Sequence, residues 1–379
     1  MLGRTNYLKE KMMNKSQLIY QYIRNHESVS KQDIVIGLKL SLPTVTQSLQ
    51  YLTELGLVDT SKKIRNTGGR NATAFTYVKT TRLAIGVYLT ANHITAVAVD
   101  LSGNVIEKEK VRIPFDLDND NYLRQIGKIV EDVKQRTSVP DKDLLGVGIS
   151  VQSLVSEDGE RVTYGMTLNF TGKTRAEIAK YVPYRNRLFH DSTTAGYAEV
   201  WIDRNISNAF YLSLNNSVGG AVVVDNSIYA GDTLKGGEIG HVIAVRDGGE
   251  QCYCGKYGCF DTVCRATKLD EYTDGNLDEF FSKLKSNDKK AMRIWDEYLD
   301  DLAFGIHNIR MLFDGKVIIG GYVGAYIEDY LEELAKRVDA KSPFEDDKAI
   351  KYMVPCKYKV EAAAAGAAIN YIDDFFDSI

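Results

Sequence analysis

The chain has 379 residues, of which 44% are hydrophobic and 26% charged, and its formal net charge is −4. This is an ordinary composition for a soluble protein, and the length allows two or three domains with a sizeable core. No stretch approaches the roughly 18 apolar residues of a membrane span, and the N-terminal residues lack the apolar segment of a secretory signal. We therefore expect a cytoplasmic protein that makes no membrane contact.

Charge is distributed unevenly along the chain. Residues 1–80 carry 12 Lys and Arg against 5 Asp and Glu, whereas the remaining residues carry 35 against 46. A basic N-terminal segment on an acidic body suggests that this segment binds a polyanion such as DNA. A charge excess that only increases solubility is the alternative.

The basic segment predicts three short helices. Residues 16–26 place apolar side chains at helical spacing, and Ser30 is positioned to cap a second helix. A third helix is expected after Ser41, with Pro43 in its first turn, where no amide partner is lost. Gly56 is expected to end that helix.

A hairpin is predicted after the third helix, between Leu57 and Val78. Three short helices and a hairpin describe a winged helix-turn-helix, whose third helix enters the major groove and whose hairpin arginines reach phosphate or a minor groove. A protein-interaction role for the third helix, and an ordinary turn at the glycine pair of the hairpin, are the alternatives. The residues expected to face DNA are Ser41, Thr44, Gln47 and Ser48 on the helix, and Gly69 and Arg70 at the hairpin tip.

From Leu83 onward the pattern changes to strands and longer helices. Two or three strands are expected over residues 83–113, and a helix follows around 120–137. A second set of strands begins near residue 209, helices dominate between about 276 and 313, and a small-residue helix closes the chain. Repeated units of strands followed by a helix predict an α/β architecture in two similar halves over residues 81–379.

The most informative stretch of the body lies between Gly236 and Asp261. It contains His241, Cys252, Cys254 and Cys259, one nitrogen and three sulfurs, which is a complete ligand set for a tetrahedral structural zinc. Three of the five cysteines fall in this one motif, which favours metal binding rather than disulfides. The motif therefore also indicates a reducing environment. The two other cysteines, Cys264 and Cys356, are predicted to be ordinary buried thiols.

Two carboxylates accompany the predicted metal site. Glu238 precedes His241 by three residues, and Asp261 follows Cys259 by two. A metal that fixes this loop would hold both acids and the imidazole together, in a cluster able to bind the hydroxyls of a polar ligand. The alternative is that both acids serve as helix caps or surface carboxylates.

These residues resemble the ROK family, which comprises bacterial repressors and sugar kinases. The resemblance covers nearly all of residues 83–379 and is most specific over Glu238–Cys259. It implies an actin-like, two-lobed ATPase fold with lobe 1 at about 83–190 plus the last helix, and lobe 2 at about 191–360. The segment 1–80 resembles the winged helix-turn-helix of the xylose-repressor-like branch, including Thr67-Gly68-Gly69-Arg70, although Asn71-Ala72 replaces the usual basic residue and proline.

The resemblance also implies the zinc site and a sugar site. Asp191 matches the catalytic aspartate of the family, His190 replaces a sugar-contacting asparagine, and Asp261 replaces a glutamate. The alternative for His190 is a packed or surface histidine without a ligand role. In a kinase the aspartate accepts the proton of the attacking hydroxyl, whereas in a sensor it only accepts a hydrogen bond. The residues implied at the sugar site are Asn169, His190, Asp191, Glu238, His241 and Asp261.

The segments that resemble phosphate loops have lost their defining residues. Tyr88-Leu89-Thr90-Ala91 replaces a first loop with an acid and two glycines, and Asn215-Asn216-Ser217-Val218 replaces a glycine- and threonine-containing second loop. Side chains at these positions block close approach of the backbone to phosphate, and no carboxylate remains to organise magnesium. We therefore predict no useful kinase activity and regard Asp191 as a vestigial base.

Together these features predict a sugar-responsive transcriptional regulator, a repressor of carbohydrate-utilisation genes. Its expected partners are operator DNA and a monosaccharide or sugar derivative, and its expected assembly is a homodimer or homotetramer. One alternative is an ATP-dependent sugar kinase of the ROK type with an appended DNA-binding domain. Another is a sugar sensor whose basic head recruits a protein.

Overall fold

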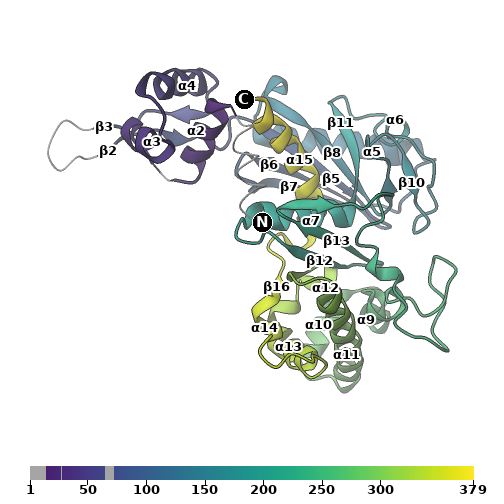
Figure 1. Ribbon diagram of the computed structural model, residues 1–379. Coiled ribbons are helices and arrows are strands. Elements are labelled where there is room, and N and C mark those ends of the chain that lie inside the picture. Colours follow the sequence, from purple (N-terminus) through teal and green to yellow (C-terminus); the bar gives the residue numbers. More distant parts are fainter. Residues whose placement is uncertain (1–13, 27, 65–71) are drawn as a thin grey trace.

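The computed structural model describes residues 14–26, 28–64 and 72–379 (Figure 1). It places a small N-terminal head beside a larger body built on two sheets. Among the described residues, no helix combines the length and apolar character that a membrane crossing requires.

The head contains three helices, each started by a side chain that accepts a backbone hydrogen bond. Asn14, Ser30 and Ser41 are these caps, and they satisfy amides that have no partner within the helix. Behind the helices, two short antiparallel strand pairs form the base of the hairpin, which projects away from the body (Figure 1). The elements are α2 (Lys15–Arg24), α3 (Lys31–Leu38), α4 (Leu42–Glu54), β1 (Val58–Asp59), β2 (Lys63–Ile64), β3 (Ala72–Thr73) and β4 (Thr76–Tyr77).

The structure corrects the prediction for one residue of α4. Ser48 was expected to face outward, but its side chain is buried and its hydroxyl lies 3.2 Å from that of Ser16. Position 48 follows Val45 by three residues and precedes Leu52 by four, so it belongs to the buried face of the helix. Ser41 and Gln47 are exposed and Thr44 is half-buried, while Gly69 and Arg70 lie outside the described residues.

Lobe 1 is a five-stranded sheet in the order β11-β8-β5-β6-β7. The first three of these strands run parallel, and the hairpins β5-β6 and β6-β7 are antiparallel. Helix α5 packs on one face of the sheet and helix α15 on the other. The elements are β5 (Leu83–Leu89), β6 (His93–Asp100), β7 (Val105–Arg112), α5 (Asp120–Thr137), β8 (Leu144–Val151), β11 (Asn186–His190) and α15 (Ala362–Ser378).

Lobe 2 repeats this plan with the strand order β14-β13-β12-β15-β16. One face packs against α10, α11 and α13, and the other packs against α7. The elements are α7 (Asp191–Ile202), β12 (Ala209–Leu214), β13 (Val218–Val224), β14 (Ser227–Tyr229), α10 (Leu277–Lys285), α11 (Lys289–Leu312), β15 (Lys316–Gly320), α13 (Leu331–Asp339) and β16 (Met353–Pro355). Shorter elements are β9 (Leu154–Val155), β10 (Val162–Tyr164), α6 (Arg175–Ile178), η2 (Ile239–His241), α8 (Asp261–Cys264), α9 (Thr267–Asp270), α12 (Gly321–Gly324), α14 (Ala349–Tyr352) and η5 (Lys359–Glu361).

Helices α7 and α15 lie between the two sheets and cross in close contact (Figure 1). A Cβ atom at Gly366 of α15 would lie only 1.8 Å from the carbonyl oxygen of Thr194 in α7. Another at Gly86 of β5 would lie 1.7 Å from the carbonyl oxygen of Ala364. The small residues of the closing helix are therefore required by packing, and the predicted α/β architecture in two similar halves is confirmed.

Candidate functional site

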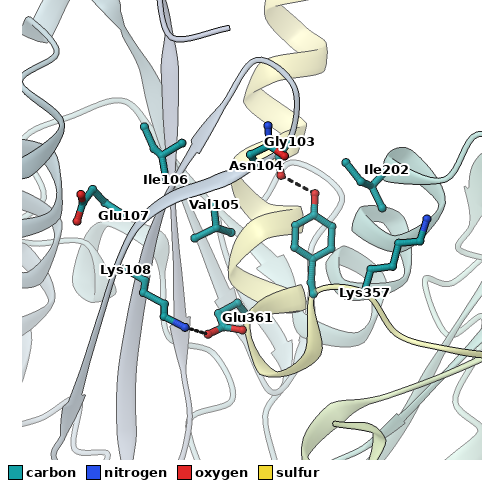
Figure 2. Close-up of a pocket in the computed structure, with 10 residues that line it drawn as sticks. Gly103, Asn104, Val105, Ile106, Glu107, Lys108, Ile202, Lys357 and Glu361 are labelled. Atoms are coloured by element: carbon teal, nitrogen blue, oxygen red, sulfur yellow. Dashed lines mark hydrogen bonds and ion pairs between the residues drawn. The ribbon is translucent and has the colours of Figure 1, made fainter. Parts of the chain in front are cut away.

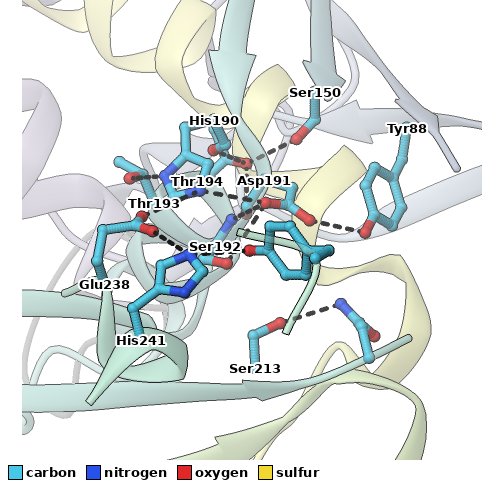
Figure 3. A network of polar contacts seen from close by, with 12 residues as sticks. Tyr88, Ser150, His190, Asp191, Ser192, Thr193, Thr194, Ser213, Glu238 and His241 are labelled. Carbon is cyan, nitrogen blue, oxygen red and sulfur yellow. Dashed lines mark hydrogen bonds and ion pairs between the residues drawn. The ribbon is translucent and has the colours of Figure 1, made fainter. Parts of the chain in front are cut away.

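Asp191 lies at the centre of the candidate site, where strand β11 ends and helix α7 begins (Figure 3). The residue is 7% exposed, and its carboxylate accepts two short hydrogen bonds. The backbone amide of Ser192 donates to Oδ1 at 2.8 Å, and the hydroxyl of Tyr88 donates to Oδ2 at 2.8 Å. These bonds hold the carboxylate in one orientation.

Tyr88 comes from the end of β5, the segment that resembles a first phosphate loop. Burial, and then the charge of Asp191, raise the pKa of Tyr88, so the phenol keeps its proton and donates to the carboxylate. The sequence showed that an acid had been lost at this position but gave no sign of the new bond. The tyrosine therefore lies against Asp191 and orients its carboxylate.

A histidine and a glutamate extend this network toward the metal-binding loop. His190 Nε2 lies 3.4 Å from Asp191 Oδ1 and 4.0 Å from Glu238 Oε1. The other oxygen of Glu238 lies 3.9 Å from His241 Nε2. Four of the six residues predicted for the sugar site, His190, Asp191, Glu238 and His241, are thus brought together (Figure 3).

The other two predicted residues lie apart from this group. Asn169 is exposed on the loop after β10, in a left-handed conformation with φ of 54°. Asp261 is buried at the start of α8 and accepts a hydrogen bond of 2.7 Å from the backbone amide of Val218. Neither residue lines the cavity beside Asp191. In this arrangement Asp261 fastens the cysteine-bearing loop to the start of β13.

His241 and three cysteines form a cluster that could hold a metal ion. Their ligand atoms all lie within 4.8 Å of one another, with Cys254 Sγ and Cys259 Sγ 3.8 Å apart. A tetrahedral zinc with bonds of about 2.3 Å to sulfur places neighbouring sulfurs about 3.8 Å apart, so the spacing fits. His241 Nδ1 faces Cys252 Sγ at 3.8 Å, which leaves Nε2 directed toward Glu238. Cys264 and Cys356 are buried free thiols, as predicted.

Tyr253 is a component of the site that the sequence analysis missed. It stands between two of the cysteines, and its hydroxyl lies 3.1 Å from His241 Nε2. The tyrosine therefore occupies the ring nitrogen that a bound hydroxyl would otherwise contact. Its position inside the Cys-x-Cys motif is the signal that could have placed it here.

The space around Asp191 is small. A cavity of about 40 Å³ lies beside it, whereas small-molecule sites commonly measure ~300 Å³ or more. A cavity of this size holds no ligand of ordinary size unless its walls rearrange. Besides the residues described above, the lining includes Gln152, Ser153, Leu154, Tyr164, Thr167, Ser192, Ser217, Val218 and Gly219.

The opposite side of Asp191, next to the second altered loop, is closed as well. The cavity between Tyr88 and Asn215 measures only about 10 Å³. The side chain of Asn215 makes two hydrogen bonds within the protein. Its Nδ2 donates to Ser213 Oγ at 3.0 Å, and its Oδ1 accepts from the backbone amide of Tyr322 at 2.9 Å. Both polar atoms of this side chain are therefore engaged in internal hydrogen bonds.

A larger, open cavity of about 610 Å³ lies elsewhere, between β7, the end of α7 and η5 (Figure 2). Its charged groups are already paired, with Lys108 Nζ 2.8 Å from Glu361 Oε1. The hydroxyl of Tyr358 donates to the carbonyl of Gly103 at 2.6 Å. The convergent polar groups of this protein are at Asp191, and we assign the candidate site there.

Sequence comparisons identify related proteins of two kinds. A family model described as "ROK family" matches residues 84–373. A putative xylose repressor from Caldicellulosiruptor sp. (strain Rt8B.4) is 22% identical over 398 residues, covering 97% of this chain and 98% of the relative. A glucokinase from Halalkalibacterium halodurans is 24% identical over 288 residues, covering 68% of this chain and 86% of the relative.

Solved structures show the same fold. A ROK family transcriptional regulator, described as a homologue of the E. coli MLC protein, superposes with a TM-score of 0.72 at 20% identity and 96% coverage of each chain. A ROK family glucokinase from Streptomyces griseus, solved with glucose and AMPPNP, gives 0.64 at 20% identity, covering 76% of this chain and 98% of that one. The expected two-lobed fold with an N-terminal winged helix-turn-helix is confirmed.

The Tyr88–Asp191 bond can be tested by stability. Tyr88→Phe leaves a buried carboxylate oxygen without its donor, so we expect a loss of about 1–3 kcal/mol in the free energy of unfolding. Tyr122→Phe is the matched control, because this buried tyrosine of the same lobe has no hydrogen-bond partner for its hydroxyl. Urea unfolding measures both, and an equal, small effect of the two substitutions would contradict the assigned bond.

Proposed function

Because the chain belongs to the ROK family, we propose that it is a sugar-responsive, DNA-binding transcriptional regulator that represses carbohydrate-utilisation genes. The observation that carries this proposal is the Tyr88–Asp191 bond, which occupies the phosphate side of the site. The residues suited to binding hydroxyls, His190, Asp191 and Glu238, remain grouped on the other side. The site therefore favours binding of a sugar over its phosphorylation.

A sugar kinase with an appended DNA-binding domain is the second candidate, and the retained Asp191 is the observation in its favour. Phosphoryl transfer depends on positioning the nucleotide and neutralising its charge. Tyr88 and Asn215 fill both phosphate loops with internal hydrogen bonds. The carboxylate of Asp191 accepts a hydrogen bond from the phenol of Tyr88. In the proposed site it therefore orients a ligand and does not act as the base for phosphoryl transfer.

The proposed effector is a monosaccharide or a close derivative. Carboxylates at Asp191 and Glu238 accept hydrogen bonds from sugar hydroxyls, and His190 can donate or accept. His241 Nε2 becomes available when Tyr253 swings away from it. Asn169 would join the site only if its loop closed over the cavity. Asp261 would contribute indirectly, by holding the metal-binding loop in place.

The proposed metal is a structural zinc held by His241, Cys252, Cys254 and Cys259. Three thiolates and one imidazole are a closed ligand set without an open position for chemistry. The ion would fix the ring orientation of His241, with Nδ1 on the metal and Nε2 toward the pocket. Its role is therefore to brace the sugar site.

The proposed DNA interface is the winged helix-turn-helix head. Ser41, the N-cap of α4, and Gln47 within the helix are exposed, and Thr44 is half-buried. Gly69 and Arg70, which lie outside the described residues, are proposed to contact DNA from the hairpin tip. One such head buries little surface, so tight specific binding calls for two heads on two half-sites. We accordingly propose a homodimer or homotetramer as the active form.

DNA binding can be tested with a duplex selected by the protein from a random pool. We expect affinity to fall steeply with salt, because phosphate contacts release counterions. Arg70→Ala should weaken binding and reduce the slope of log affinity against log salt by about 1. Arg246→Ala is the control, since this arginine of the body has a side chain 94% exposed. Unchanged DNA affinity in Arg70→Ala would refute the hairpin assignment.

Metal content tests the zinc site. Protein purified without chelators should contain about one zinc per chain by elemental analysis, and Cys254→Ser should lose most of it. Cys356→Ser should keep the zinc, because Cys356 is a buried thiol that does not belong to the cluster. Wild-type protein with less than about half an equivalent would speak against the assignment.

A further inference from the structure

The head meets the body around the side chain of Arg24, at the end of α2. Its guanidinium carbon lies 4.3 Å from the ring centre of Phe376 and 5.2 Å from that of Trp201. The ring of Tyr77, from the head itself, is 5.9 Å away. One cation of the head is thus surrounded by aromatic rings that belong to α15, α7 and β4.

Other contacts fix α2 to the last turn of α15. The side-chain amide of Gln17 donates to the carbonyl oxygens of Phe376 and Asp377, at 3.2 and 2.8 Å. The ring of Tyr20 packs edge-on against Phe376 with centroids 5.5 Å apart. One apolar core runs from these head residues into the body. The head is therefore docked on α15 and on the end of α7. We call this contact, centred on Arg24, Trp201 and Phe376, the seat of the head.

Helix α7 connects this seat with the candidate site. It begins at Asp191, whose carboxylate lines the site, and continues without a break to Ile202. Twelve residues of α-helix span about 18 Å, at 1.5 Å per residue. Trp201 is in the last turn. Asp191, which lines the cavity, and Trp201, which contacts Arg24, therefore lie at opposite ends of one helix.

Hydrogen bonds and packing fix Trp201 to the helix layer formed by α7 and α15. Its indole nitrogen donates to Asp373 of α15 at 2.8 Å, and the hydroxyl of Tyr197 donates to the same carboxylate. A Cβ atom at Gly103 would lie 2.5 Å from the indole ring, so the β6-β7 turn closes tightly over it. The ring is therefore fixed to both α7 and α15, and a shift of α7 against α15 changes how the indole lies beside Arg24.

From this arrangement we propose that α7 transmits the ligand state of the Asp191 site to the DNA-binding head through the contact between Trp201 and Arg24. This inference rests on the proposed function and assigns the regulation of the same site. A ligand that bonds to Asp191 competes with Tyr88 for the carboxylate and repositions the start of the helix. Helix displacements of about 1–2 Å are typical of such switches, and a cation lying over a ring is sensitive to them.

The effect on DNA follows from linkage. A sugar changes DNA affinity only through the difference in its own affinity for the two head positions. If the seat at Arg24 is the element that distinguishes these positions, weakening the seat removes the coupling but leaves both binding sites intact. This separates a coupling residue from a residue that contacts sugar or DNA.

The test compares two arginines that lie over the same indole. Arg24 belongs to the head, whereas Arg204, at 5.6 Å from the Trp201 ring centre, belongs to the body. Arg24→Met and Arg204→Met keep an unbranched apolar stem and remove the charge. DNA affinity is measured by fluorescence anisotropy on the selected duplex, with and without D-xylose, or D-glucose where xylose gives no thermal shift. Calorimetry gives the sugar affinity of each variant.

In the wild type we expect the sugar to change the dissociation constant for DNA by about fivefold or more. In Arg24→Met this ratio should fall below about twofold, with sugar affinity unchanged, while Arg204→Met keeps the wild-type ratio. Trp201→Phe, which leaves α2 untouched, should behave as Arg24→Met and guards against a folding defect of the head.

An undiminished ratio in both Arg24→Met and Trp201→Phe would overturn the inference and leave the proposed function standing. A ratio lost equally in Arg204→Met would also overturn it, because the effect would then belong to the indole alone. Wild-type protein that binds no duplex, or whose DNA affinity is changed by no member of a panel of monosaccharides and their phosphates, would overturn the proposed function itself.

Discussion

The hydrogen bond from Tyr88 to Asp191 joins the first strand of lobe 1 to the first residue of α7. It determines what the rest of the site can do. The phenol keeps its proton because it is buried, and it holds the carboxylate toward lobe 1. His190 lies 3.4 Å from this carboxylate and 4.0 Å from Glu238, so the polar groups suited to binding a ligand gather beside it. The position of α7, and through it the seat of the head, depends on the same carboxylate.

The metal-binding loop supplies the other wall of the site. Asp261 anchors the loop to the amide of Val218, and His241 presents one ring nitrogen to the cysteines and the other to the pocket. Tyr253 covers that second nitrogen at 3.1 Å. His241 and Tyr253 therefore form this wall together, beside a cavity of about 40 Å³ that Tyr253 also lines.

The sequence predicted the features that depend on short-range pattern. The cysteine spacing predicted the cluster of His241 with three cysteines, and the helical periodicity predicted the helices of the head. It could not predict pairings between distant segments, such as Tyr88 with Asp191 or Arg24 with Trp201, because spacing carries no information about them. Ser48 was misplaced for a related reason: a hydroxyl on the edge of an apolar stripe is compatible with either face until a partner such as Ser16 is known.

The most direct measurement of the central claim is a calorimetric titration of the full-length protein with magnesium and AMPPNP. In the proposed regulator, Tyr88 and Asn215 fill the segments that resemble phosphate loops, so the account predicts no binding heat at nucleotide concentrations up to about 1 mM, where typical enzyme sites are occupied. Binding with a micromolar dissociation constant would contradict it, because a nucleotide could then enter beside Asp191 and the site would still be that of a kinase.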